Sequence, residues 1–155
     1  LDSFCDDVLR VIRENDIPFD KIAFELTESQ NETDFEMVRE KIRQLKEYGI
    51  TFYLDDFGTG YSSFHYLTRI PIDTLKIDKS FVAKINENEK DAYIAEIIIN
   101  LAHKLGIQVI AEGVENIEQL KILQEETCDV LQGYFFSRAV TEEEFMKMMK
   151  EESKL

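Results

Sequence analysis

The chain has 155 residues, of which 44% are hydrophobic and 32% are charged, a length and balance that suit one globular domain with a buried core. Its formal net charge of −14 argues against binding to a DNA or RNA polymer, because such affinity comes largely from lysine and arginine on phosphates. We find no apolar run long enough for a membrane span, no signal-peptide pattern and no cysteine framework, so we expect a cytoplasmic protein without membrane insertion.

Helical and strand patterns alternate along the chain. Apolar residues at three- and four-residue intervals mark the helices, and short β-branched or aromatic runs mark the strands. The expected elements are a helix over 3–15, a strand over 21–27, a helix from Thr33 to Gly49, strands over 50–54 and 73–78, a helix over 91–105, a strand over 107–111, a helix capped at Asn116, a strand with its turn over 128–133, and a helix from Thr141. Capping boxes support two of the helix starts, Thr33 with Glu36 and Thr141 with Glu144.

Two of these helices carry predictions about packing. The face predicted to point inward on the helix over 91–105 consists of Ile94, Ile97, Ile98 and Leu101. In the last helix, Phe145 lies near a methionine cluster predicted to pack in the core or against the end of the chain, made of Met146, Met148 and Met149.

Five strands that alternate with helices indicate an α/β fold, a parallel sheet with right-handed crossovers. A polar side chain lies at or near the carboxyl end of each strand; in order these are Glu25, Asp55 with Asp56, Lys76, Glu112 and Gln132. Such regular units resemble those of a (β/α) barrel, and a complete barrel of eight units takes about 250 residues. The chain is therefore expected to form about five parallel βα units of the eight.

Asp55 and Asp56 end the apolar strand over 50–54, and a glycine-rich loop with Gly58 and Gly60 follows them. Ligands of parallel α/β sheets bind beyond the carboxyl ends of the strands, so two acids there indicate a metal and phosphate site. A divalent cation would let an acidic cleft accept an anionic ligand. The alternative is a capped turn in which the aspartates accept hydrogen bonds from nearby amides.

Five motifs together resemble the EAL domain, the family of bacterial phosphodiesterases that hydrolyse cyclic di-GMP. They are Phe-Glu-Leu-Thr-Glu-Ser at 24–29, Leu-Asp-Asp-Phe-Gly-Thr-Gly-Tyr-Ser-Ser at 54–63, Thr-Leu-Lys-Ile-Asp at 74–78, Ala-Glu-Gly-Val-Glu at 111–115, and Gln-Gly-Tyr-Phe-Phe at 132–136. Each motif alone is a weak signal, but all five in order at the spacing of barrel units are specific. The resemblance covers the whole chain but only the later part of the family's domain.

The resemblance implies a partial TIM-type (β/α) barrel and a site for two Mg²⁺ or Mn²⁺ ions that opens cyclic di-GMP to 5′-pGpG. It implies that the metal ligands are Glu25, Asp55, Asp56 and Glu112, with Asp56 on the second metal. It implies that Lys76 holds and helps to activate the attacking water, with Gln132 and Glu112 also in the catalytic set. Glu28 would fix the Asp-Asp loop without touching metal, and Gly58 and Gly60 would give that loop its backbone freedom.

The chemistry suits these residue types, because Mg²⁺ prefers carboxylate oxygens and paired metals stabilise both the attacking and the leaving oxygen. Ordinary structural roles remain the alternatives: Glu25 as a surface acid and Lys76 as a salt-bridge partner. For Glu115 and Asp78, turn bonding or ion pairing is the preferred interpretation. His65 and His103 are predicted to be structural.

The Glu-Ala-Leu motif that names the family is absent, and so is the asparagine-bearing strand that follows it in family members. A smaller departure is Ala139, where the family usually has proline. We therefore expect residues 1–155 to be a single incomplete EAL domain, its C-terminal part, which alone does not hydrolyse cyclic di-GMP at the family's rate. Its open sheet edges predict self-association, such as a dimer, and the family resemblance implies an upstream sensor or GGDEF-type domain in the parent protein.

Two other functions stay open. The chain could be a non-catalytic module that binds cyclic di-GMP or another protein, although retention of the acids and of Lys76 favours an active parent. A different two-metal barrel hydrolase is the weaker option.

Overall fold

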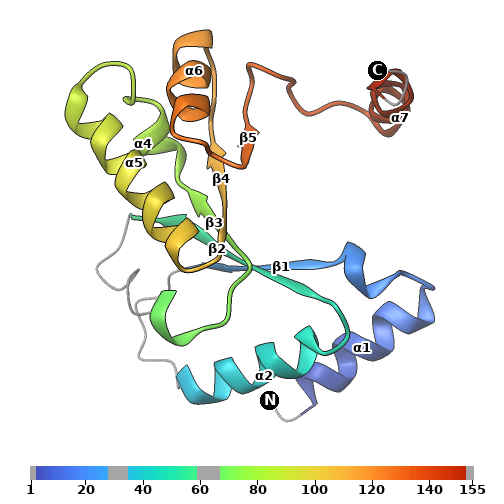
Figure 1. The fold of residues 1–155 in the computed structure, drawn as a ribbon. Helices are drawn as coiled ribbons and strands as arrows, with labels where there is room; N and C mark the ends of the chain where they lie inside the picture. The colour runs from blue at the N-terminus through green and yellow to red at the C-terminus, as the bar shows by residue number, and fades with distance from the viewer. Residues whose placement is uncertain (1–2, 28–34, 59–66, 153–155) are drawn as a thin grey trace.

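The computed structural model describes residues 3–27, 35–58 and 67–152, and it contains one five-stranded parallel sheet with helices packed on it (Figure 1). In chain order the elements are α1 (Phe4–Glu14), η1 (Phe19–Lys21), β1 (Ala23–Thr27), α2 (Phe35–Lys46), β2 (Thr51–Phe57), β3 (Thr74–Ile77), α4 (Lys79–Val82), α5 (Glu89–Lys104), β4 (Gln108–Glu112), α6 (Ile117–Glu125), β5 (Val130–Gln132) and α7 (Glu142–Glu152). Within this part of the chain, no helix is both long and apolar enough to cross a membrane.

The strands lie side by side in sequence order, β1-β2-β3-β4-β5, and every neighbouring pair is parallel. Parallel neighbours need a crossover connection, and helices α2, α5 and α6 lie in three of the four connections. This confirms the predicted α/β fold, a run of (β/α) barrel units. Because all five strands point the same way, their carboxyl ends meet along one edge of the sheet.

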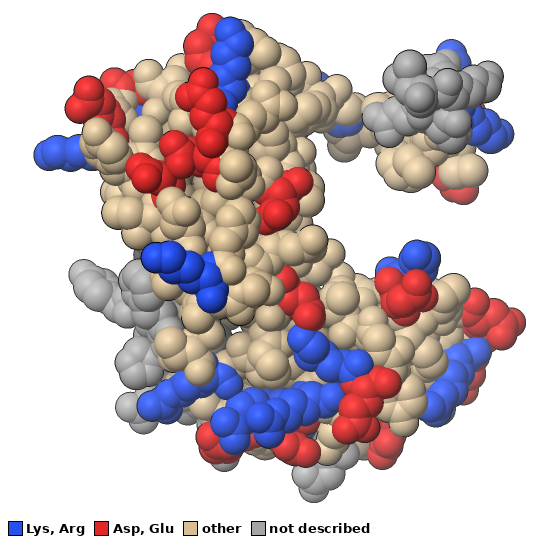
Figure 2. All heavy atoms as spheres, in the orientation of Figure 1, with Lys and Arg blue, Asp and Glu red and all other residues tan. Residues whose placement is uncertain are grey.

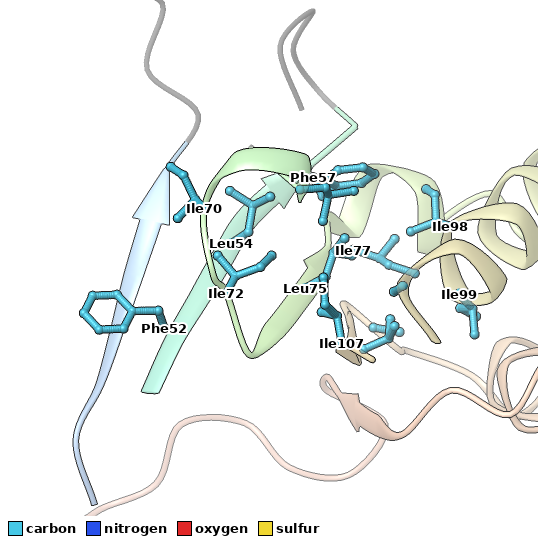
Figure 3. Close-up of a cluster of buried hydrophobic side chains, with 14 of the residues drawn as sticks. Phe52, Leu54, Phe57, Ile70, Ile72, Leu75, Ile77, Ile98, Ile99 and Ile107 are labelled. Carbon is cyan, nitrogen blue, oxygen red and sulfur yellow. The ribbon is translucent and has the colours of Figure 1, made fainter. Parts of the chain in front are cut away.

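One face of the sheet is apolar and forms the core. Leu54, Leu75 and Val109 are at most 1% exposed, and the register places them side by side on neighbouring strands. Figure 3 shows further buried side chains between these strands and α5, among them Ile77 and Ile99. The opposite face is more open at β1, where Ala23, Glu25 and Thr27 are exposed, whereas Phe24 and Leu26 are half-buried beside Phe52 and Leu54.

The packing of α5 differs from the prediction. Ile94 is 38% and Ile97 62% exposed, whereas the buried face of the helix consists of Ala95, Ile98, Ile99 and Ala102. The helix is apolar on more than one side, so its periodicity alone does not select the buried face. The two alanines have small side chains, and this lets the helix approach the sheet closely.

Helix α7 stands apart from the rest of the molecule at the end of an extended segment (Figure 1). Its predicted capping box is confirmed, because the Thr141 amide donates to Glu144 Oε2 at 3.0 Å and the Glu144 amide donates to Thr141 Oγ1 at 3.4 Å. The prediction that its methionines pack in a core is wrong for the described residues, because Met146, Met148 and Met149 are 40–51% exposed.

Other local predictions fare differently. The predicted helix cap at Asn116 is confirmed, and the structure shows in addition that Gln119 makes it a reciprocal capping box. The short helices η1 and α4 were not predicted, because neither is long enough to show a periodic pattern. Thr33 lies outside the described residues.

Candidate active site

Strand register gathers the predicted polar residues on the open face of the sheet. Glu25 pairs with Tyr53, Tyr53 pairs with Thr74, and Glu112 pairs with Gln132. Since side chains alternate between faces along a strand, Asp55 lies on the same face as Tyr53, and Lys76 on the same face as Thr74. Tyr53 itself, half-buried two residues before Asp55, was not singled out from the sequence, although period-two spacing from Asp55 points to it.

The two adjacent aspartates form a β-bulge, which turns their side chains in different directions. Leu54 pairs with Leu75 and Phe57 with Ile77, so Asp55 and Asp56 together oppose Lys76 alone. Asp56 adopts a left-handed φ of 54°, a conformation that aspartate tolerates better than most residues. As a result Phe57 returns to the core at 3% exposed, Asp55 stays half-buried on the site face, and Asp56 is exposed at the end of the strand.

Lys76 is the centre of the site. Its ammonium nitrogen lies 2.7 Å from Glu25 Oε1, 3.0 Å from Asp55 Oδ1 and 2.8 Å from Glu112 Oε1. These carboxylates come from three different strands, on both sides of β3. The Lys76 side chain is only 9% exposed, whereas that of Glu25 is 50% exposed, so the cluster opens toward β1.

Lys76 stays protonated among these carboxylates. Burial by itself would lower the pKa of Lys76, but the close carboxylates of Glu112, Glu25 and Asp55 outweigh it and raise the pKa above its ordinary value. Lys76 is therefore a permanent cation that neutralises part of the charge of three acids.

The donors present suit a hard divalent cation. Asp55 Oδ1 is buried and lies 3.0 Å from Lys76 Nζ, yet it accepts no hydrogen bond of acceptable angle, which leaves a carboxylate oxygen unsatisfied. Carboxylate oxygens are the ligands that Mg²⁺ and Mn²⁺ prefer. Among the described residues no three acidic, histidine or cysteine side chains are arranged around a metal position, because the carboxylates converge on Lys76 instead.

The remaining predicted residues lie around this cluster. Gln132 is exposed at the end of β5, and its backbone oxygen accepts a hydrogen bond from the Val114 amide at 3.0 Å. Gly58 has a φ of +97°, and a Cβ there would lie 2.8 Å from the Phe81 ring, so glycine is needed both for conformation and for space. Glu28 and Gly60 lie outside the described residues.

The loops after β4 and β5 are locked together behind Glu112 and Gln132. The Val114 amide donates to Gln132, and the Phe135 amide donates to the Val114 oxygen at 2.9 Å. Gly133 permits this contact, because any Cβ on it would lie 2.1 Å from the Val114 oxygen. The lock fixes the carboxyl ends of both strands.

Two residues predicted to be structural have structural contacts. Asp78 caps α4 by accepting a hydrogen bond from the Ser80 amide at 3.0 Å. At the amino ends of β4 and β5, Asp129 Oδ2 accepts from the Val109 amide at 2.8 Å and lies 2.9 Å from His103 Nε2. His65 lies outside the described residues.

Replacing Asp129 by asparagine is expected to lower the stability of the fold and to leave the Lys76 cluster intact. Burial would raise the pKa of Asp129, but hydrogen bonds with His103 and Val109 outweigh it and lower that pKa below its ordinary value of 3.8. The ionised carboxylate therefore stabilises the fold above that value, and the contribution is lost as pH falls through the lower folded pKa. Asp129→Asn should cost about 1 kcal/mol in urea unfolding at neutral pH and flatten the acid side of the stability profile. Asp20→Asn, in an exposed ion pair, is the control and should change neither.

The amino-acid sequence of the chain is similar to that of known proteins. A family model described as "EAL domain" matches residues 2–139. The cyclic di-GMP phosphodiesterase NbdA of Pseudomonas aeruginosa is 40% identical over 136 residues, which are 88% of this chain and 17% of that protein. The chain thus spans less than a fifth of the length of this curated relative.

Two solved structures are also similar. The EAL domain of Mycobacterium smegmatis DcpA matches with a TM-score of 0.91 and 35% identity, over 97% of this chain and 67% of that one. The calcium and cyclic di-GMP complex of Klebsiella pneumoniae BlrP1 matches with a TM-score of 0.77 and 31% identity, over 86% of this chain and 34% of that one.

Proposed function

Because the chain belongs to the EAL domain family, we propose that it carries most of the active site of a metal-dependent phosphodiesterase that hydrolyses cyclic di-GMP to 5′-pGpG. One observation carries the proposal: Lys76 lies within 3.0 Å of carboxylates from three strands, at the edge of a parallel sheet where ligands bind. The name of NbdA supports the activity, and the contents of the BlrP1 complex support both the nucleotide and a divalent cation.

In this proposal Glu25, Asp55 and Glu112 hold one Mg²⁺ or Mn²⁺ ion, and Asp56 contributes to a second. When bound, the metals supply charge neutralisation and a water acidic enough to attack a phosphodiester at neutral pH. Lys76 keeps the three carboxylates together and presents a permanent positive charge that orients an anionic nucleophile.

The residues around the cluster position it. Gln132 supports the same shell from the end of β5, whose backbone is fixed by Val114. Gly58, with a φ of +97°, gives the loop after Asp56 its backbone conformation, and the roles of Glu28 and Gly60 in supporting that loop stay predictions.

We further propose that residues 1–155 are the C-terminal part of an EAL domain, which the match to only 67% of the DcpA chain supports. Alone, this part is expected to hydrolyse cyclic di-GMP far more slowly than a whole domain, because ligands from other strands would be missing. An upstream sensor or GGDEF-type domain, a cytoplasmic location and self-association through the open sheet edges belong to the same proposal.

A binding module without turnover is the second candidate. The observation that favours it is the closed arrangement of the three carboxylates on Lys76, with no metal position among the described residues. Such a module would bind cyclic di-GMP and release no pGpG.

Metal binding by the chain tests the proposal without requiring turnover. We expect titration with Mn²⁺ in a calorimeter to show binding that Asp55→Asn weakens by about tenfold or more, because it removes the negative charge of a carboxylate with a buried oxygen, and loss of a residue that merely orients a metal ligand already costs about tenfold. Asp20→Asn, at the opposite end of the sheet, should bind as the parent does. In a parallel assay with cyclic di-GMP, release of pGpG even at a low rate favours the phosphodiesterase, whereas nucleotide binding without pGpG and without Mn²⁺ binding favours the module. Mn²⁺ binding that Asp55→Asn leaves unchanged would contradict the metal assignment.

A further inference from the structure

The short helix α4 contacts both of the loops that follow the acids Asp56 and Glu112. It follows β3 after the single residue Asp78, which caps it by accepting a hydrogen bond from the Ser80 amide at 3.0 Å. Val82 of the same helix is fully buried in the core. Helix α4 is therefore held at its start by the cap and along its inner side by the core.

One contact joins α4 to the loop after Asp56. A Cβ added to Gly58 would lie 2.8 Å from Cε2 and 2.9 Å from Cζ of Phe81, so the far edge of the ring packs directly on the Gly58 backbone. Phe81 is half-buried and also packs against the core. The ring therefore occupies the space beside Gly58 and limits movement of the backbone toward α4.

Two contacts join the same helix to the loop after β4. A Cβ added to Gly113 would lie 2.6 Å from Cβ and 3.3 Å from Cα of Lys79, so this loop lies against the first turn of α4. Just after α4, the Ala83 oxygen accepts a hydrogen bond from Gln119 Nε2 at 3.5 Å, and Gln119 Oε1 accepts one from the Glu115 amide at 2.7 Å. Helix α4 thus connects the two loops and sets the spacing between them.

Only one of these contacts depends on a particular side chain of α4. Gly113 meets Cα and Cβ of Lys79, which every residue except glycine would provide. Gly58 meets the far end of the Phe81 ring, whereas Cδ2 of that ring would lie 3.7 Å from the added Cβ, at an ordinary contact distance. A leucine side chain ends at its δ carbons, so it would leave the space beside Gly58 empty. The backbone there could then move, and Asp56 is only two residues away.

We propose that Phe81 is a positioning residue for the metal site: its ring fixes the backbone at Gly58 and thereby the place of Asp56 relative to Glu112. The role rests on the proposed function, because it concerns acids that are assigned to metal binding. Phe81 itself contacts neither metal nor nucleotide in this role and acts through Gly58.

The first test contains no metal. Gly58→Ala adds a Cβ that meets the Phe81 ring in the parent but not the shorter side chain of Phe81→Leu. Its effect on the unfolding equilibrium constant is therefore expected to be about tenfold smaller in the Phe81→Leu background. Gly106→Ala is the control, because a Cβ there meets no atom within 4 Å, and its effect should be the same in both backgrounds. Equal effects of Gly58→Ala in the two backgrounds would overturn the proposal.

The second test measures Mn²⁺ binding by folded variants, with circular dichroism as the check on folding. Phe81→Leu is expected to weaken binding in a calorimeter about tenfold, as loss of a residue that orients a metal ligand does, and to change the electron paramagnetic resonance spectrum of bound Mn²⁺. The control is Ile50→Val, which removes one carbon from a side chain that is 1% exposed, just before β2 and far along the strand from Asp55. It also lowers stability but should leave the affinity and the spectrum unchanged.

Weak binding of Mn²⁺ elsewhere does not disturb this comparison. Figure 2 shows many acidic side chains on the surface over α5 and α6, which attract cations, but neither substitution changes a charge. If Phe81→Leu bound Mn²⁺ as the parent does, or no more weakly than Ile50→Val, the role of Phe81 would be overturned and the metal site would stand. If the parent bound no Mn²⁺, the proposed function would be overturned and the role of Phe81 with it.

Discussion

Lys76→Met is expected to destabilise the metal-free chain by about 3 kcal/mol, although methionine nearly matches lysine in length. Removing the ammonium leaves Glu25, Asp55 and Glu112 facing one another around a nearly buried position. Breaking a buried ion pair costs about 3–5 kcal/mol, and the low end applies because Glu25 is half exposed. Urea unfolding at neutral pH measures the loss.

Divalent cations should reverse this loss. With the ammonium gone, the three carboxylates can gather around Mn²⁺, which binds the folded state and stabilises it by mass action. Millimolar Mn²⁺ is therefore expected to raise the stability of Lys76→Met more than that of the parent. This separates a cation-binding cluster from an ordinary ion pair.

Lys46→Met is the matched control. Lys46 lies 2.6 Å from a single carboxylate, that of Asp73, and donates to the Pro71 oxygen at the other edge of the sheet. Its loss should cost less than that of Lys76, and Mn²⁺ should not restore it. If Mn²⁺ stabilised both variants equally, or neither, Lys76 would not be holding a metal-binding set of carboxylates.

The stabilising effect of Lys76 should not change over the physiological pH range. Its folded pKa is raised above the ordinary value of 10.5, so its contribution is fully present below that value and is lost only as pH rises through the higher folded pKa. The stability difference between parent and Lys76→Met is accordingly expected to stay constant between about pH 6 and pH 9.

The sequence predicted which residues reach the site because the signal is local. Each polar residue follows or ends an apolar run, and parallel strands bring their carboxyl ends to one edge. That reasoning placed Glu25, Asp55, Lys76 and Glu112 at the same edge, and the structure joins these four by direct contacts. Their chemical roles stay predictions.

What the sequence did not predict depends on pairing between distant segments. The bulge at Asp55 and Asp56 exists only relative to β3, because the register shifts there and returns Phe57 to the core. The buried face of α5 depends on the sheet it meets, so Ile97 was assigned inward and lies outward. The alternation of β1 predicts two faces but not whether a neighbour covers its edge.

Gly133→Ala is expected to disrupt the carboxyl end of β5 at a cost of about 3 kcal/mol or more, as overpacking against backbone does. A Cβ would lie 2.1 Å from the oxygen and 2.3 Å from the nitrogen of Val114. Neither atom can withdraw freely, because the Val114 amide donates to Gln132 and its oxygen accepts from Phe135. Relief of the clash must therefore break one or both of these hydrogen bonds.

Gly106 provides the comparison that separates crowding from backbone strain. Its φ is +74°, and a Cβ added there would meet no atom within 4 Å, so Gly106→Ala should cost only about 1 kcal/mol, the penalty for a left-handed alanine. Gly133→Ala should in addition speed hydrogen exchange of the Val114 and Phe135 amides, while Gly106→Ala leaves them protected. Val114 follows Glu112 by two residues. Loss of the hydrogen bonds of Val114 should therefore also weaken Mn²⁺ binding at the site that contains Glu112. Equal costs for the two variants, with both amides still protected, would mean that the loops after β4 and β5 yield easily and do not hold Glu112 in place.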